Sequence, residues 1–467
     1  MGIAARIAAI PIFVLIKTSP KLLLKTLSMN PQQDTSPMTQ KLRRIIPFVS
    51  IMTMIASADA ADLPSTISFQ TQEIDPHVGQ VCYALAVADV NSDGKPDLVA
   101  VTENAVVWYE NPTWKRSDII RDRTEKDNVC LQPMDIDGDG RIDFALGAAW
   151  RPADTATGGT LQWLRQPTQS GQPWTIHPLG NEPTMHRLRF GDVLGTGKPQ
   201  LITAPLQGRG TKAPNWNAGK GVRVMVHSIP EKPETQAWPA VVADDSLHTT
   251  HNLQIVDFDN DGDQDILICA WEGVFVLSYD KAQKQFARTK IGTGNQTATP
   301  FKGASEIKMG RLKDGRRYVA TIEPWHGFQV AVYTEPGKPS AKAVPAPVGV
   351  ADEPLEQGMW TRSVIAQPVT WGHGLWTADV DGDGDDELFV GQRDKNKAGT
   401  PAGPGVYLFD PVSSEQSLTF HRQVIDDGGV AVEDLVVADF NGDGRPDVAA
   451  GGRATHNVRI YWNKGKK

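Results

Sequence analysis

The chain has 467 residues, a formal net charge of −8 and three cysteines. It has no basic stripe, which excludes nucleic acid as the expected partner. Three cysteines are too few for a disulfide framework. Cys82 and Cys130 precede acidic motifs in neighbouring repeats, so they form either one bridge or two small buried thiols, and Cys269 is interpreted as a buried thiol.

The N-terminal 60 residues are expected to carry an export signal. Residues 1–37 are interpreted as a spurious extension, and Met38 as the true start. A basic segment (41–44) then precedes the apolar run IIPFVSIMTMIA, and an A-x-A cleavage site follows at 58–60. The alternative is an anchor that is kept. We expect a mature domain over 61–467 that is periplasmic or secreted, with no retained membrane segment.

An acidic motif recurs along the rest of the chain. Its clearest copy is DVDGDGDDELFVG (379–391), with acidic residues at positions 1, 3, 5 and 9 and glycine at position 6. Five well-preserved copies and two degenerate ones make seven units, which indicates a repeat architecture. The copies start at residues 89, 135, 192, 257, 310, 379 and 439.

These loops have the oxygen-rich spacing that calcium prefers. An EF-hand is excluded, because position 12 is apolar and belongs to a β-rich run instead of being a glutamate between helices. We expect calcium in about five loops, with plain Asx-turns as the alternative. The expected ligands are Asp89, Asn91, Asp93, Asp97, Asp135, Asp137, Asp139, Asp143, Asp257, Asp259, Asp261, Asp265, Asp379, Asp381, Asp383, Glu387, Asp439, Asn441, Asp443 and Asp447.

Each repeat contains four β-like segments, which predicts an all-β, seven-bladed β-propeller of four-stranded blades. The last repeat lacks an outer strand, since only DVAAGG and NVRIYWN follow its loop. The segment TISFQTQEI (66–74) resembles that missing strand. We therefore expect the N-terminal strand to complete the C-terminal blade and to seal the ring.

Polar residues gather where each innermost strand begins. Six residues before the loop, three of seven repeats carry histidine (His186, His251 and His373), and Arg187 and Glu306 occupy the next column. The column four before the loop is apolar, as a buried strand requires. Imidazoles with a carboxylate suit a divalent metal with an open position. The alternative is a hydrogen-bonded polar lining of a water-filled channel.

The strand after each loop returns toward the same channel mouth, opposite the calcium loops. Aromatic faces and guanidinium groups there suit carbohydrate rings and uronates. The alternative is a set of exposed loop residues without a ligand. The expected substrate-binding residues are Trp150, Arg151, Trp271, Trp325 and Arg453.

The acidic units resemble the FG-GAP/VCBS repeats of seven-bladed propellers. Five further segments resemble the propeller of aldos-2-ulose dehydratases and of related lyases that cleave rhamnose–glucuronate linkages: MHRL (185–188), IGTG (291–294), GR (310–311), ATIEPWHG (320–327) and DVDGDGDDELFV (379–390). This resemblance implies elimination β to a carbonyl or carboxylate. It also implies roles for His186, Arg187, Glu323, His326 and His373.

The resulting hypothesis is an exported carbon–oxygen lyase acting on a carbohydrate by β-elimination. His186, His251, His373 and Glu306 would hold the channel metal. His326, oriented by Glu323, would be the base, while Arg187 and Arg393 hold the anionic oxygen and Tyr83 is the acid. The alternative is a non-catalytic, calcium-braced propeller that binds glycans or protein partners.

Overall fold

A computed structural model describes residues 66–342, 358–396 and 403–467. They lie within one compact unit, Asp62–Lys467. The expected extension and signal segment (1–60) lie outside the described residues. No stretch of the described chain forms a helix with the length and apolarity needed to cross a membrane.

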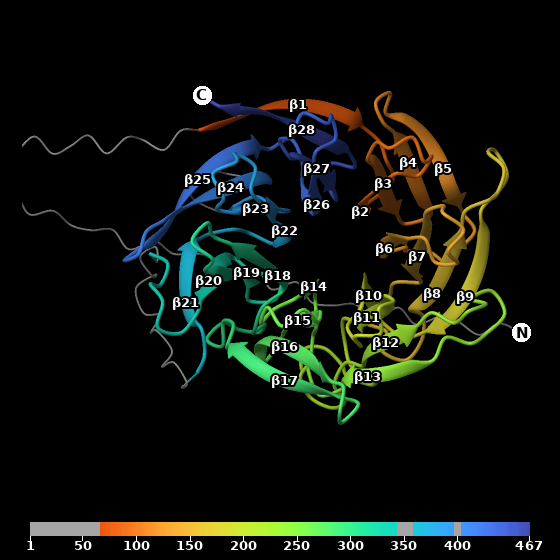
Figure 1. The fold of residues 1–467 in the computed structure, drawn as a ribbon, viewed down its shortest axis with the longest axis horizontal. Coiled ribbons are helices and arrows are strands. Elements are labelled where there is room, and N and C mark those ends of the chain that lie inside the picture. Colours follow the sequence, from red (N-terminus) through yellow and green to blue (C-terminus); the bar gives the residue numbers. More distant parts are fainter. Residues whose placement is uncertain (1–65, 343–357, 397–402) are drawn as a thin grey trace, which may run out of the picture. The chain divides into compact units, whose positions relative to one another are not determined.

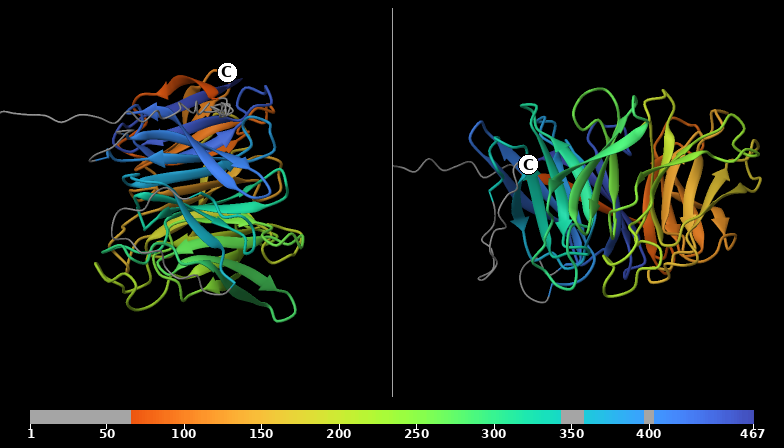
Figure 2. Two further views of the ribbon diagram at one scale, coloured as in Figure 1. Left: turned by 90° about the vertical axis from the view of Figure 1, so that its left-hand side faces the viewer. Right: turned by 90° about the horizontal axis from the view of Figure 1, so that it is seen from below.

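The described chain forms seven four-stranded antiparallel sheets, arranged as blades of a ring (Figure 1). The predicted seven-bladed propeller is confirmed. Side views show the strands running between the two faces of the ring (Figure 2). In each blade the acidic loop connects the end of the innermost strand to the start of the second strand, so the loops share one end of the inner strands.

The strands of each blade fall into four ranks, counted outward from the ring axis. The innermost are β2 (Cys82–Ala88), β6 (Cys130–Met134), β10 (Met185–Gly191), β14 (Leu253–Val256), β18 (Glu306–Arg311), β22 (Gly372–Ala378) and β26 (Val432–Ala438). The second are β3 (Asp97–Thr102), β7 (Asp143–Ala148), β11 (Gln200–Pro205), β15 (Asp265–Ala270), β19 (Arg317–Glu323), β23 (Glu387–Gln392) and β27 (Asp447–Gly452). The third are β4 (Ala105–Glu110), β8 (Thr160–Arg165), β12 (Val224–Ser228), β16 (Gly273–Asp280), β20 (Gln329–Thr334), β24 (Gly405–Ser413) and β28 (Val458–Lys466). The outer are β5 (Lys115–Arg121), β9 (Thr175–Asn181), β13 (Ala240–Asp244), β17 (Gln285–Gly292), β21 (Thr361–Ala366), β25 (Leu418–Asp427) and β1 (Ile67–Asp75).

The ring is closed by its two ends. β1 pairs antiparallel with β28, with Phe69 opposite Asn463 and Thr71 opposite Tyr461. The last sheet therefore has the order β1-β28-β27-β26, and β1 lies beside β28 in Figure 1. This arrangement agrees with the predicted closure, and it covers a strand edge that would otherwise be exposed.

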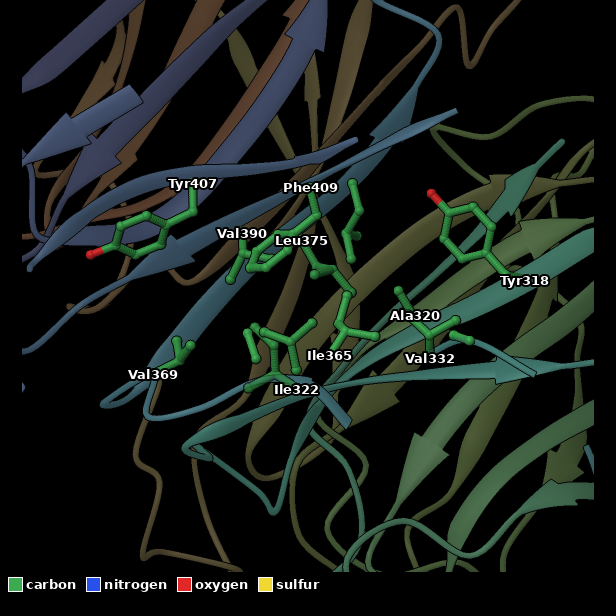
Figure 3. Close-up of a cluster of buried hydrophobic side chains, with 14 of the residues drawn as sticks. Tyr318, Ala320, Ile322, Val332, Ile365, Val369, Leu375, Val390, Tyr407 and Phe409 are labelled. Carbon is green, nitrogen blue, oxygen red and sulfur yellow. The ribbon is translucent and has the colours of Figure 1, made fainter. Parts of the chain in front are cut away.

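Apolar layers between neighbouring blades hold the ring together. Between the fifth and sixth blades, Tyr318, Ile322, Leu375 and Phe409 belong to one buried cluster (Figure 3). Full burial of one such side chain contributes about 1.5–3 kcal/mol. Because the second strand of each blade is buried on both faces by such layers, its sequence is a nearly continuous apolar run.

The three cysteines are free and buried. Burial raises the pKa of the Cys130 thiol to about 12. Of the two alternatives for Cys82 and Cys130, the structure has the buried thiols.

Candidate active site at the channel mouth

Four histidines gather where the inner strands begin. His186 lies on β10, His251 just before β14, His373 on β22, and His326 in the turn between β19 and β20. His251, His326 and His373 each offer a ligand atom within 4.8 Å of the other two. The Nε2 atoms of His251 and His326 are 2.9 Å apart. The sequence predicted a group of His186, His251 and His373, whereas the structure groups His326 with His251 and His373.

The Nδ1 side of three rings is fixed by the neighbouring blade. His186 Nδ1 lies 2.9 Å from the carbonyl oxygen of His251, which occupies the same column of the next blade. His251 Nδ1 lies 3.1 Å from the Ser305 oxygen, and His373 Nδ1 lies 2.5 Å from the Glu433 oxygen. A carbonyl can only accept, so each Nδ1 carries the proton and each Nε2 keeps its lone pair.

His186 differs from the other rings at Nε2. Its Nε2 accepts from Arg187 Nη1 at 3.2 Å, so the lone pair is already engaged. The ring also contacts Trp150 at 4.8 Å and His251 at 4.5 Å between centroids. His186 thus borders the group of three imidazoles and is held by Arg187.

The carboxylate of Glu306 lies on the Nδ1 side of the histidines. Its Oε1 is 2.9 Å from His251 Nδ1 and 3.9 Å from His373 Nδ1. Arg187 Nη2 lies 3.6 Å from the same oxygen, and Asn252 Nδ2 donates to Oε2 at 2.5 Å. Burial alone would raise the pKa of Glu306, but His251 and Arg187 outweigh it and hold that pKa well below its usual range.

His326 is the partly exposed member of the group. Its ring stacks on Trp325 at 4.8 Å and packs against Trp371 at 4.7 Å between centroids. Its φ of 50° is unusual for a residue other than glycine, and it turns the ring out of the strand path. Burial lowers the pKa of His326 well below its ordinary value, with His251 and His373 adding to the effect, so the imidazole is neutral at pH 7.

Two family models match the chain. The aldos-2-ulose dehydratase β-propeller domain matches residues 158–336, and an FG-GAP-like repeat matches residues 89–146 and 379–450. Aldos-2-ulose dehydratase from Phanerodontia chrysosporium is 30% identical over 250 residues, which are 50% of this chain and 26% of the relative. The expected resemblance is confirmed.

Two solved structures align with most of this chain at low sequence identity. An Agrocybe aegerita lectin, described as recognising non-reducing terminal N-acetylglucosamine, has 14% identity and a TM-score of 0.46, with 81% of this chain and 93% of the lectin covered. A BBS1N domain in complex with ARL6DN has 12% identity and a TM-score of 0.47, with 86% and 98% covered.

The segment matched by the aldos-2-ulose dehydratase propeller contains most of the histidine site, namely His186, Arg187, His251, Glu306 and His326. His373 lies outside both matched ranges. The chain spans about a quarter of the length of the dehydratase that it matches.

The predicted oxygen clamp is divided between two neighbourhoods. Arg187 is buried and faces His186 and Glu306. Arg393 instead lies over the Trp371 ring at 3.9 Å, with its Nη1 3.7 Å from Glu433. Of the two predicted clamp residues, Arg393 is therefore the one that contacts Trp371, which in turn packs against His326.

Tyr83, the predicted acid, lies near the ion pair of Arg453 and Glu433. Arg453 donates to Glu433 at 2.6 Å, and its guanidinium is 5.5 Å from the Tyr83 ring centroid. The Tyr83 hydroxyl donates to Asp127 at 3.2 Å. Burial raises the pKa of Tyr83 to about 12, so the phenol keeps its proton at neutral pH.

Glu323 does not orient His326, and that expectation is corrected. Its carboxylate is fully buried and accepts from Thr321 at 2.8 Å and from the Tyr333 hydroxyl at 2.6 Å. Arg362 Nε donates to its other oxygen at 2.7 Å. Strand alternation aims Glu323 into its own blade, while the turn that follows carries His326 to the channel.

The predicted aromatic rim is only partly assembled at the histidines. Trp150 and Trp325 contact His186 and His326 directly. Trp271 is buried, and Arg151 contacts Glu125 and Thr157 on an exposed loop. The sequence did not predict Trp371 as a site residue. It stands two residues before His373, so extending the polar column toward the N-terminus would have found it.

The acidic loops have the predicted form. In each well-preserved copy, one oxygen of position 9 accepts the backbone N–H of position 2, as Glu387 does from Val380 at 2.7 Å. Carboxylates of three loops have ligand atoms within 4.8 Å: Asp135, Asp137 and Asp143; Asp257, Asp259 and Asp265; Asp379, Asp381, Asp383 and Glu387. The copies at 89–97 and 439–447 have asparagine at position 3. The oxygen-rich donor set fits calcium.

Proposed function

We propose that this protein is an exported carbohydrate-active carbon–oxygen lyase that performs β-elimination on a sugar or a uronic-acid-containing glycan. The observation that carries the proposal is the approach of His326 Nε2 to His251 Nε2, beside His373. His251 and His326 lie in the segment that is similar to the aldos-2-ulose dehydratase propeller. Elimination needs a base for a carbon acid, a group that stabilises the developing oxyanion, and an acid for the leaving oxygen.

His326 is proposed as the base. Ser305 fixes the proton of His251 on Nδ1, so His251 Nε2 accepts from His326 Nε2 and leaves the lone pair of His326 on Nδ1. Within the described residues, His326 Nδ1 has no hydrogen-bond partner. Glu306, beside His251 Nδ1, stabilises positive charge that passes along this pair. His251 therefore takes the orienting role that the sequence assigned to Glu323.

Arg393 and Tyr83 are proposed for the two oxygens. Arg393 would hold the carbonyl or carboxylate oxygen on which negative charge develops. Tyr83 would give its proton to the leaving oxygen, because its phenol is protonated at neutral pH. Trp325 and Trp371 would offer flat faces to a sugar ring.

The same imidazoles also fit a divalent cation. His251, His326 and His373 would hold it, since their side chains are neutral and two of them have Nδ1 fixed by a backbone carbonyl. Such a cation supplies Lewis-acid polarisation of a carbonyl when bound. With such a cation bound, His326 would serve as one of its ligands, and a group other than His326 would have to take the proton.

The test is product formation. The full chain is incubated with 1,5-anhydrofructose and with a panel of uronic-acid polymers, and the ultraviolet absorbance of an unsaturated product is followed. We expect an absorbing product from one of them. Binding of a glycan without any unsaturated product on the whole panel would favour the non-catalytic, calcium-braced propeller.

A further inference from the structure

A cavity of about 440 Å³ lies in the central channel and is lined by the innermost strands of all seven blades. Its walls come from inner-strand residues that lie between the histidine column and the acidic loops. At the histidine end the inner strands are buried, whereas Phe190, Ile255, Trp376 and Val437 toward the loop end are partly exposed. The partly exposed side of the cavity wall therefore lies toward the acidic loops.

Lys308 on β18 is the unusual residue of this cavity. Its side chain is buried, with 7% of the residue exposed, and its Nζ lies 4.3 Å from the centre of the Trp376 ring. No described carboxylate lies within ion-pair distance of Nζ, and no described group accepts a hydrogen bond from it. An ammonium on a buried side chain without an ion-pair partner is costly. The Trp376 face and the longer-range attraction of Asp434 and Glu306 compensate only part of that cost. Burial accordingly lowers the pKa of Lys308 to about 7, with Arg189 adding to the effect, so a bound anion would favour the charged form.

Arg189 on β10 adds a second cation without an acidic partner among the described residues. Its Nη2 donates to the Asn252 amide oxygen at 3.0 Å, and its Nη1 donates to the Leu188 carbonyl at 2.7 Å. Both hydrogen-bond partners are neutral, and Asp434 and Glu306 attract this charge without forming an ion pair with it.

The acidic residues of the cavity are already engaged. Glu306 is held by His251, Arg187 and Asn252. Asp434 accepts the backbone N–H groups of Leu85 at 2.9 Å and Leu435 at 3.0 Å.

The charges of the ionised side chains that line the cavity therefore do not sum to zero. The lining contains three cationic side chains (Arg187, Arg189 and Lys308) and two carboxylates (Glu306 and Asp434), which leaves one positive charge when all five are ionised. A single negative charge would complete the balance. Apolar walls from Phe190, Ile255 and Leu435 would face a carbon skeleton, and the volume is within the usual range for small-molecule sites.

We propose that the central channel contains a second binding site, for a monocarboxylate of sugar-acid size, whose carboxylate lies against Lys308 and Arg189. The site at Lys308 and Arg189 does not include the histidines, although Arg187 and Glu306 contact both the cavity and the histidines. Its occupancy does not depend on the proposed elimination reaction.

Isothermal titration calorimetry of the full chain tests this proposal, in a chloride-free buffer that contains calcium. The probes are sodium glucuronate, sodium acetate, inorganic phosphate and neutral glucose. We expect glucuronate to bind more tightly than acetate and phosphate, and glucose to give no signal. Glucose binding as tightly as glucuronate would overturn the proposal, and so would phosphate binding more tightly than glucuronate.

Three variants locate the bound carboxylate. Lys308→Met is expected to weaken glucuronate binding by about tenfold to a hundredfold, the loss typical of one charged hydrogen bond. Lys308→Arg keeps the charge and is expected to retain binding, which guards against a folding defect in the methionine variant. Lys115→Met, at an exposed position on β5, is the matched control.

His326→Ala separates this site from the histidines. We expect it to bind glucuronate as the wild type does. Loss of binding in His326→Ala, or unchanged binding in folded Lys308→Met, would place the ligand elsewhere and overturn the inference.

Discussion

His326 Nε2 lies 2.9 Å from His251 Nε2, although 75 positions separate the two residues in the chain. His326 lies in a turn between β19 and β20, while His251 lies just before β14, the inner strand of the preceding blade. The contact therefore exists only because two blades meet at the channel. It supports the proposed base relay and is also the contact that a bound metal would use.

Replacement of His326 should stop the proposed chemistry without unfolding the ring. We expect His326→Ala to lower kcat on a confirmed substrate by about 10²–10⁴-fold, the usual contribution of a general base. The measurement is the initial rate of unsaturated product. His421→Ala, on an exposed part of β25, is the matched control and should keep the wild-type rate. An unchanged rate in folded His326→Ala removes this residue from the mechanism.

Metal analysis separates the two uses of the imidazoles. If the three histidines hold a divalent cation, the purified chain should contain one transition-metal ion that survives mild chelation, and His373→Ala should lose it. Elemental analysis by mass spectrometry measures both, and His421→Ala should keep the metal. A metal-free wild-type chain with full activity would leave the relay of Glu306, His251 and His326 as the working arrangement.

Glu323 is expected to act in stability and not in catalysis. Glu323→Gln removes the counter-charge of Arg362 in a buried network, so we expect a loss of about 3 kcal/mol in the free energy of unfolding. Urea titration measures it. The control is Glu335→Gln. The Glu335 carboxylate is partly exposed where it pairs with Arg317, whereas that of Glu323 is fully buried, so the loss of the Glu335 carboxylate should cost about 1 kcal/mol or less. A large fall in kcat per folded molecule of Glu323→Gln would restore the catalytic role.

The acidic loops should make stability depend on calcium and pH together. Burial raises the pKa of Asp143 to about 7, of Asp447 to about 6 and of Glu387 to about 9, and neighbouring carboxylates add to the effect. These folded-state values lie above those of the unfolded chain, which are about 4. A raised carboxyl pKa means that the folded state binds protons more tightly, so this stability is lost as pH rises from about 4 to about 9.

Without calcium, the melting temperature should therefore fall between pH 5.5 and pH 8.5 as these carboxylates ionise. With calcium in excess the fall should be smaller, because the cation compensates the charge that forms. Differential scanning calorimetry with and without chelator measures both curves. Equal calcium stabilisation at the two pH values would contradict an ionisation-linked site in these loops.

The seven-bladed ring could be predicted from the order of the residues alone. The period of the acidic motif counts the blades, and the missing outer strand of the last repeat pairs the two ends of the chain. Both are local properties: a loop of fixed spacing is followed by a run of β-branched and apolar residues, and each blade repeats it. The polar column also located the mouth of the channel, since a register counted from the loop is the same in every blade.

Which side chains meet at the channel depends on how the blades come together. The sequence placed His186 with His251 and His373, but Arg187 engages the Nε2 of His186, and the turn after β19 brings His326 in its place. It paired Glu323 with His326, whereas strand alternation directs that carboxylate to Arg362 and Tyr333. Lys308 and Arg189 were not distinguished from ordinary strand residues. Their significance depends on which charges lack a partner, and partners come from other blades, whose side-chain directions no linear spacing contains.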